Sequence, residues 1–394
     1  MTENIHQEQA AVRGLLLAIS EELGKPVPQE WKDAVRATPR HRFLPDRIWL
    51  DDENGDLRPC DLRDEPDRWF EAAYANGPVV TQVNDGEEPA DSAEAWASSS
   101  ASSPAMVVRM LDDLGVWPGL KALEIGTGTG WNAALLAHRL GADRVTSIEV
   151  DPDVARQARA SLNAAGLAVE AVSGDGADGW APRQPYDRII STCSVSRVPT
   201  AWIEQTDPGG VIVTPWESPM LSFGLLRLVV GEQHTYGKFS AHGSFMLMRA
   251  QRTDLRIYRD VVRDHHQPDE STTRLSPWQV CGEDLDVRFA LGLKLGDVWT
   301  AWHHEPDVEG VATRLWVATT DATSWAAVDH DGRQEDRFTV SQYGPRRLWD
   351  EIEKAHGWWE KADRPGPDRF GLRIVGDEQQ VFLDGPTTVI SRVP

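Results

Sequence analysis

A glycine-rich turn at residues 122–131, which read ALEIGTGTGW, constrains the fold of this chain more than any other feature. Apolar residues predict a buried strand that ends at Ile125, and a helical pattern over 131–140 follows the turn. Backbone N–H groups of such a turn, together with the start of the helix, can face a ligand at close approach. A strand, a glycine turn and a helix in this order predict the first unit of a parallel α/β sheet.

The same alternation continues on both sides of the turn. We expect strands at 121–125, 144–149, 168–173, 186–192 and 210–215, and helices at 104–114, 131–140, 151–165 and 200–205. Strands that alternate with helices favour βαβ units. The sequence therefore predicts an α/β fold with a doubly wound, mostly parallel sheet of the Rossmann-like type.

The flanking regions differ from this core in pattern. Apolar side chains at helical spacing predict helices over 8–23 and 29–37, and residues 76–103, rich in Asp, Glu, Ser and Gly, predict a mobile loop. After about Pro219 we expect strands at 225–230, 245–249, 299–303, 315–319 and 380–383 and a helix at 345–356. The chain thus divides into an N-terminal helical and loop region (1–103), a core (104–218) and a C-terminal α+β module (219–394).

Composition narrows the class of protein. A chain of 394 residues with 40% apolar content can form one large and one smaller domain. The start of the sequence lacks a signal-peptide pattern and no window approaches the roughly 18 to 20 apolar residues that cross a bilayer, so we expect a cytoplasmic protein without a membrane partner. A net charge of −22 would repel a phosphate backbone, so nucleic acid is not expected as a partner.

Two further strand ends carry side chains that suit an adenosyl group. Glu149 ends the strand after the glycine turn, where a carboxylate can accept hydrogen bonds from both ribose hydroxyls. Asp175, between Gly174 and Gly176 after the third strand, can accept a bond from an adenine amino group. The alternatives are a solvated acid for Glu149 and an ordinary turn residue for Asp175. Because the turn reads G-x-G-x-G rather than G-x-G-x-x-G, an adenosyl ligand with an amino-acid tail is favoured over NAD.

Other candidate sites are weaker. The histidine pairs 265–266 and 303–304 lie next to each other in sequence, and neighbours on a strand point to opposite faces. The three cysteines are far apart and no Cys or carboxylate stands at ligand spacing, so we expect no metal site. Trp349, Trp358 and Trp359 favour core packing, with a peptide groove as the alternative.

From about residue 35 to 215 the chain resembles the protein-L-isoaspartate O-methyltransferase family. The matching segments are 35–45 (VRATPRHRFLP), 74–78 (YANGP), 100–106 (SASSPAM), the glycine turn, 174–180 (GDGADGW) and 186–199 (YDRIISTCSVSRVP). Their order and spacing are specific to that family. The resemblance implies a class I methyltransferase fold with S-adenosylmethionine as cofactor.

The resemblance also implies roles for single residues. Ser102 falls on the serine of the family's Thr-Ile-Ser-x-Pro segment, so its hydroxyl is expected at the methyl-transfer site as the catalytic group. The alternative is that Ser102 caps the helix that begins near Pro104. The expected cofactor-binding residues are Ser100, Glu124, Gly126, Thr127, Gly128, Gly130, Glu149, Asp175 and Gly176.

The chain departs from the family in the parts that contact the acceptor peptide. The tight Asp-x-Pro-Leu-Pro-Ile-Gly loop is replaced by the longer, acidic stretch 79–97, and the Ala-Ala-Ala-Pro strand end becomes 192–196 (TCSVS). The family's core enzyme also lacks the part after Pro219. Extended actinobacterial members of similar length and acidity accompany ribosomally made peptides such as graspetides, lanthipeptides and lasso peptides. They methylate an ordinary aspartate, whose ester closes to an aspartimide.

Three hypotheses follow. The main one is an S-adenosylmethionine-dependent O-methyltransferase that esterifies an aspartate side chain in a modified ribosomal precursor peptide and so leads to aspartimide. The alternatives are a repair-type protein-L-isoaspartate O-methyltransferase and a non-catalytic binding module with the same fold. A carboxylate with a pKa near 4 is ionised at pH 7 and needs no general base, so no catalytic histidine is expected. The C-terminal module is expected to recognise the peptide.

Overall fold

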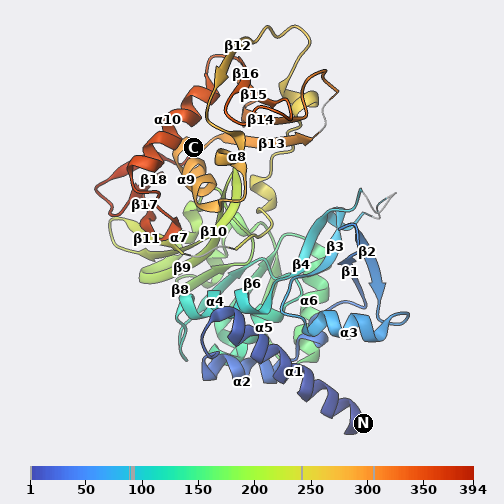
Figure 1. Cartoon of the computed structure of the whole chain (residues 1–394). Helices are drawn as coiled ribbons and strands as arrows, with labels where there is room; N and C mark the ends of the chain where they lie inside the picture. Colours follow the sequence, from blue (N-terminus) through green and yellow to red (C-terminus); the bar gives the residue numbers. More distant parts are fainter. Residues whose placement is uncertain (1, 88, 90–93, 241–242, 305–306) are drawn as a thin grey trace. The chain divides into compact units, whose positions relative to one another are not determined.

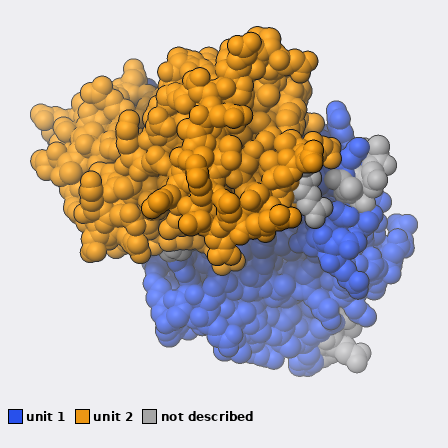
Figure 2. All heavy atoms as spheres, turned by 45° about the horizontal axis from the view of Figure 1, so that its top comes forward, with its two compact units in different colours: residues 1–193, 199–214 blue, residues 194–198, 215–394 orange. Residues whose placement is uncertain are grey.

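A computed structural model describes residues 2–87, 89, 94–240, 243–304 and 307–394 of the chain (Figure 1). The chain forms two compact units, coloured separately in Figure 2. The first contains residues 1–193 and 199–214, and the second contains 194–198 and 215–394. Residues 1–103 therefore share a unit with the core, and the long strand β9 (Thr206–Ser218) passes from the first unit into the second.

The core of the first unit is a parallel sheet. Its strands are β5 (Ala122–Ile125), β6 (Val145–Glu149), β7 (Glu170–Ser173), β8 (Tyr186–Ser191) and β9. They lie in the order β9-β8-β5-β6-β7, and each neighbouring pair is parallel. All residues of β5 and β6 are buried, as expected for central parallel strands. This confirms the α/β fold class with a mostly parallel, doubly wound sheet.

The expected helices of this unit are present, and α3 is one that the sequence pattern did not predict. They are α1 (Thr2–Leu23), α2 (Gln29–Ala37), α3 (Pro66–Tyr74), α4 (Pro104–Leu114), α5 (Trp131–Leu140), α6 (Pro152–Ala164) and α7 (Thr200–Glu204). Local signals explain their ends. Asp151 caps α6 by accepting hydrogen bonds from the N–H groups of Asp153 and Val154, and Pro152 occupies the first helical position.

The prediction of a mobile loop over 76–103 is wrong for the residues that the structure describes there. β3 (Val79–Val83) and β4 (Ala97–Ala101) form an antiparallel pair, and β1 (Arg47–Asp51) and β2 (Leu57–Asp61) complete a sheet of order β2-β1-β3-β4. Small polar side chains are compatible with a strand once its backbone is paired, and composition does not reveal the pairing partner. Residues 88 and 90–93 of the acidic stretch lie outside the described residues.

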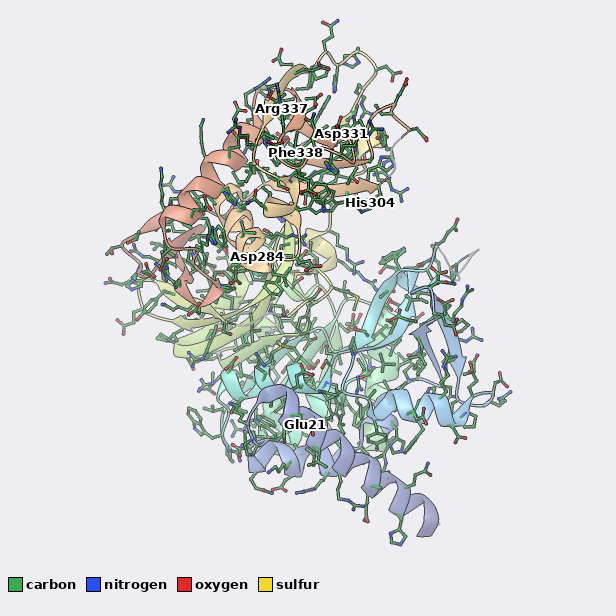
Figure 3. The ribbon with its side chains drawn as sticks, in the orientation of Figure 1. Glu21, Asp284, His304, Asp331, Arg337 and Phe338 are labelled. Atoms are coloured by element: carbon green, nitrogen blue, oxygen red, sulfur yellow. The ribbon has the colours of Figure 1, made fainter. Side chains whose placement is uncertain are left out.

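The second unit is an α+β structure, as the strand-rich sequence predicts. Its strands are β10 (Leu221–Val230), β11 (Thr235–Ser240), β12 (Asp269–Thr273), β13 (Val298–His304), β14 (Thr313–Thr319), β15 (Trp325–His330), β16 (Phe338–Tyr343), β17 (Phe370–Val375), β18 (Glu378–Leu383) and β19 (Val389–Arg392). They pair in the orders β19-β18-β17-β11-β10 and β12-β16-β15-β14-β13. Its helices are α8 (Pro277–Cys281), α9 (Leu285–Leu295), which Asp284 caps (Figure 3), and α10 (Leu348–Lys361).

One expected strand of this unit is absent from the described structure. Residues 245–249 do not form a strand: Leu247 makes an isolated bridge with Ser194, and a 3₁₀ turn begins at Arg249. Trp349 and Trp359 are buried in α10, which agrees with the core interpretation, whereas Trp358 is half-buried. None of the described helices combines the length and apolar character that crossing a bilayer requires. Across the described residues, no group of three or more His, Cys, Asp or Glu side chains could hold a metal ion.

Candidate functional site

The turn between β5 and α5 adopts a conformation that requires glycine. Gly126, Gly128 and Gly130 have φ values of +88°, +52° and +86°, in the left-handed region that other residues rarely adopt. A Cβ atom on Gly126 would lie 2.7 Å from the Thr192 hydroxyl oxygen, whereas one on Gly128 would meet no atom closer than 3.7 Å. A side chain at Gly126 would therefore collide with Thr192, whereas the space beside Gly128 could hold a Cβ atom.

The start of α5 offers hydrogen-bond donors. Gly130 is the N-cap residue, and within the described residues no side chain caps this helix. The first N–H groups of a helix have no acceptor inside it and carry the positive end of the helix dipole. They suit a carboxylate or another anion.

Beneath the turn lies a buried polar network centred on Glu124. The Glu124 carboxylate is fully buried and accepts hydrogen bonds from Asn132 Nδ2 at 2.6 Å and from the Ser147 hydroxyl. Ser147 also bonds the Thr127 hydroxyl at 2.6 Å. Burial raises the pKa of Glu124 to about 7, although the bonds from Ser147 and Asn132 oppose this. The side chains of Glu124 and Thr127 thus support the turn from below, and their contact with a cofactor remains a prediction.

Glu149 lies beside the turn, at the end of β6. Its carboxylate is 9% exposed and accepts hydrogen bonds from the N–H groups of Gly128 at 2.9 Å and Asp151 at 3.1 Å. An ionised carboxylate has about four lone-pair positions, so it can accept more than two hydrogen bonds. The alternative of a solvated acid does not describe this side chain, because it is buried and holds the turn.

The third strand end lies next to Glu149. Ser173 pairs with Glu149 between β7 and β6, and the Gly174 N–H donates to the Glu149 carbonyl at 2.9 Å. Asp175 is exposed, and its Oδ1 accepts a bond from the Ala177 N–H at 2.9 Å, as a turn residue does. Gly176 is buried. The three strand ends that the sequence singled out are therefore neighbours, while a role for Asp175 in binding adenine stays a prediction.

The segment 100–106, which contains Ser100 and Ser102 and is called the serine segment below, also reaches the glycine turn. The Ser100 carbonyl oxygen is the atom 3.7 Å from the Cβ position on Gly128, so the end of β4 lies against the glycine turn. The alternative in which Ser102 caps α4 is wrong, because the N-cap residue is Ser103. Within the described residues the Ser102 hydroxyl has no hydrogen-bond partner. It is available for an acceptor.

Two residues that the sequence analysis did not single out support this site. Asn76 Oδ1 accepts the Ala105 N–H at 2.9 Å and so caps α4 from a distant segment. Gln82 Nε2 donates to Asp151 Oδ2 at 3.0 Å, and its Oε1 accepts the Ser98 hydroxyl at 2.9 Å. The β3–β4 hairpin is thus bonded to the N-cap residue of α6, two residues after Glu149. Asn76 lies in the segment 74–78, whose resemblance to the family could have indicated its importance. No feature of the sequence pointed to Gln82.

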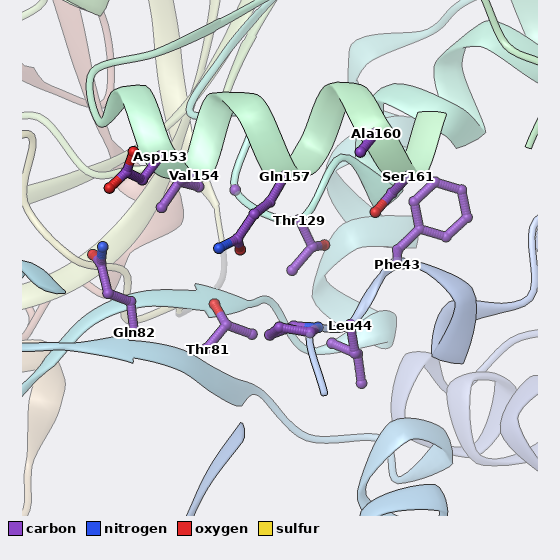
Figure 4. Close-up of a pocket in the computed structure, with 12 residues that line it drawn as sticks. Phe43, Leu44, Thr81, Gln82, Thr129, Asp153, Val154, Gln157, Ala160 and Ser161 are labelled. Carbon is purple, nitrogen blue, oxygen red and sulfur yellow. The ribbon is translucent and has the colours of Figure 1, made fainter. Parts of the chain in front are cut away.

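A cavity of about 300 Å³ adjoins the turn on the α6 side (Figure 4). Gly128 and Thr129 line it from the turn, Gln157 and Ser161 from α6, and Thr81 from β3. Phe43 closes another side. Among the described lining residues, Gly128 is the one that the sequence analysis predicted to bind the cofactor. The cavity therefore lies beside the predicted cofactor site and does not coincide with it.

Comparison with known proteins places the chain in a family. A family model described as protein-L-isoaspartate(D-aspartate) O-methyltransferase matches residues 68–229. Protein-L-isoaspartate O-methyltransferase from Methanopyrus kandleri is 33% identical over 186 residues, which cover 46% of this chain and 67% of that protein. The chain belongs to the protein-L-isoaspartate O-methyltransferase family. The family member from Pyrococcus horikoshii is 39% identical over 148 residues, and the match spans 37% of this chain and 66% of that protein, just under two thirds of its length.

The likeness of fold extends beyond the parallel sheet. A solved structure titled protein-L-isoaspartate O-methyltransferase matches 95% of this chain and 100% of its own, with a TM-score of 0.53 and 18% identity. That match therefore extends over the part after Pro219, which the sequence analysis took to be absent from the family's core enzyme. The family-model match contains every predicted site residue, from Ser100 to Gly176.

Proposed function

We propose that this chain is an S-adenosylmethionine-dependent O-methyltransferase that esterifies the free carboxylate of isoaspartyl residues in peptides or proteins. The observation that carries the proposal is the arrangement around the glycine turn: the buried Glu149 carboxylate bonds the Gly128 N–H on one side, and the uncapped start of α5 lies on the other. Membership of the family supports the choice of acceptor.

The residues of this site fit the cofactor. Glu149 would hold the ribose, the first N–H groups of α5 would hold the carboxylate of the amino-acid tail, and Asp175 with Gly176 would hold the adenine. Ser100 lies against the turn and would contact the same ligand. When bound, the cofactor supplies a methyl group whose C–S bond breaks as the ester O–C bond forms, with the electron pair left on sulfur.

The acceptor needs orientation rather than a base. Its carboxylate is ionised at neutral pH, so no proton has to be removed before attack. Ser102 would donate its hydroxyl hydrogen to one carboxylate oxygen and hold the other in line with the methyl group. The first turn of α4, capped by Asn76, keeps this segment in place.

A second candidate function is methylation of an ordinary aspartate in a modified ribosomal peptide, with closure of the ester to an aspartimide. It is favoured by the paired β3–β4 hairpin, which stands where the family has a tight acceptor loop and is bonded through Gln82 to Asp151. The same hypothesis assigns recognition of the peptide to the C-terminal unit. After esterification, the backbone nitrogen of the next residue would attack the ester carbonyl and release methanol.

The test compares two peptides of one sequence that contain either isoaspartate or aspartate, each incubated with methyl-labelled cofactor. We expect label in the isoaspartyl peptide and loss of about 10- to 100-fold in kcat for Ser102→Ala, since a hydrogen bond to a charged group is worth about 1.5–3 kcal/mol. Ser103→Ala is the matched control, because its hydroxyl bonds the Asn76 carbonyl instead.

Label in the aspartyl peptide and not in the isoaspartyl peptide would replace the main proposal by the second candidate. Binding of S-adenosylhomocysteine without transfer to any of these peptides would instead favour a binding module. Transfer that depends on both Ser102 and Glu149 contradicts that third hypothesis.

A further inference from the structure

Arg40 is a buried cation held by backbone carbonyl groups. It lies in the 3₁₀ turn Arg40–Phe43, and its side chain is 1% exposed. Its Nη1 donates to the carbonyl oxygens of Ala73 at 3.3 Å and Ala75 at 3.2 Å, and its Nη2 donates to those of Gly77 at 3.1 Å, Ala101 at 3.0 Å and Ser102 at 3.1 Å. One guanidinium group thus bonds two separate stretches of the chain, 73–77 and 101–102.

Within the described residues, no carboxylate pairs with this cation, and its Nε–H lacks an acceptor. Burial lowers the pKa of Arg40 to about 9. A buried charge without a counter-ion is costly unless hydrogen bonds replace its hydration, and here carbonyl dipoles do so. An apolar side chain would avoid this cost but would leave the carbonyls of Ala101 and Ser102 without their donor.

Arg40 lies between two parts of the proposed site, the segment that contains Ser102 and the start of α5. Ala101 ends β4, and Ser102 carries the hydroxyl that we assign to the acceptor. The guanidinium carbon of Arg40 lies 5.6 Å from the centre of the Trp131 ring, and Trp131 follows Gly130 as the first residue of α5. Arg40 therefore contacts both the backbone of the serine segment and the helix that begins at the glycine turn.

We propose that Arg40 is a positioning residue for methyl transfer: by holding the Ala101 and Ser102 carbonyls against α5, it sets where the Ser102 hydroxyl stands relative to the cofactor. This inference rests on the proposed function. Lysine cannot replace it, because an ammonium group has three N–H donors on one atom and cannot span carbonyls that a planar guanidinium reaches with two nitrogens. A displacement of about 1 Å at a reacting group can cost about 100-fold in rate.

The test measures kcat on the isoaspartyl peptide and the Kd of S-adenosylhomocysteine for the full chain. Arg40→Lys should lower kcat by about 10- to 100-fold and change the Kd by less than about threefold. Arg42→Lys is the matched control: Arg42 lies in the same turn, but its side chain is 58% exposed and pairs with Glu8. This control should keep kcat within about twofold of wild type.

A double-mutant cycle separates positioning from general support of the fold. If Arg40 acts through Ser102, Arg40→Lys should lower kcat by less than about twofold in a Ser102→Ala background. Equal losses in both backgrounds would overturn the proposal, as would a folded Arg40→Lys chain with wild-type kcat. Arg40→Gln, with a planar amide, is the second variant if the lysine chain does not fold. Failure of both to fold would show a purely structural role, and an inactive wild type would refute the proposed function itself.

Discussion

Glu124 predicts a measurable pH dependence of stability. Its carboxyl group is fully buried, and burial raises its pKa from an ordinary 4.5 to about 7. Because the folded protein binds this proton more tightly than the unfolded chain, the contribution to stability is complete below about pH 4.5 and is lost as pH rises through about 7. Glu124→Gln replaces the ionisable carboxyl group by a neutral amide of similar shape, which can still form a hydrogen bond with Ser147.

The size of the effect follows from the pKa. At about 1.36 kcal/mol per pH unit, the difference between the two pKa values corresponds to about 3.4 kcal/mol. Between pH 5 and pH 8 the wild type should lose about 2.5 kcal/mol of this amount, since part of the loss falls below pH 5. The free energy of unfolding of Glu124→Gln relative to wild type should rise by the same amount over this range.

Urea unfolding of the full chain at several pH values between 5 and 8 measures this difference. Comparison of variant and wild type at equal pH cancels the other titrating groups. Glu21→Gln serves as control for the loss of one carboxyl group, because Glu21 is exposed on α1 (Figure 3) and lies outside the buried network of Glu124. A Glu124→Gln difference that stays constant within about 0.5 kcal/mol would show that this carboxyl group does not titrate as argued.

Three further predictions concern the turn and its neighbours. Glu149→Gln should weaken binding of S-adenosylhomocysteine by about tenfold or more, measured by calorimetry, because hydrogen bonds to a charged group contribute about 1.5–3 kcal/mol; unchanged affinity would remove Glu149 from the cofactor site. Gly126→Ala should lower the melting temperature more than Gly128→Ala, because only the first places a Cβ 2.7 Å from another atom; the reverse order would contradict the turn geometry. Asn76→Ala should cost about 1 kcal/mol of stability in chemical unfolding through loss of the α4 cap, and an unchanged free energy would rule out that cap.

Elements whose signals are local could be predicted from sequence. The α5 and α6 helices, the strands of the parallel sheet and the glycine turn all occur within a few residues of their expected positions, because apolar periodicity, glycine and a capping aspartate act over one or two turns of chain. The cofactor site was predicted from residues that stand at consecutive strand ends, which a parallel sheet brings to one edge. The family was predicted from matching segments in the same order and spacing.

Elements that depend on distant partners could not be predicted in this way. The β3–β4 hairpin reads as a loop because both strands are short and β4 is serine-rich. β3 is paired on both sides, with β1 and with β4. The strand expected at 245–249 has the right apolar content but forms a single bridge. Strand formation needs a partner backbone, and local composition carries no information about one.

The sequence by itself determined the fold class, the glycine turn and the carboxylate that follows it, since these depend on residue type and short spacing. Only the tertiary structure decided how Ser102 is held. Arg40 stands about 60 residues before the serine whose carbonyl it bonds, and Asn76 caps a helix that begins nearly 30 residues later. Hydrogen bonds of this kind depend on where folding places distant backbone groups, so their donors and acceptors can be identified only once the chain is folded.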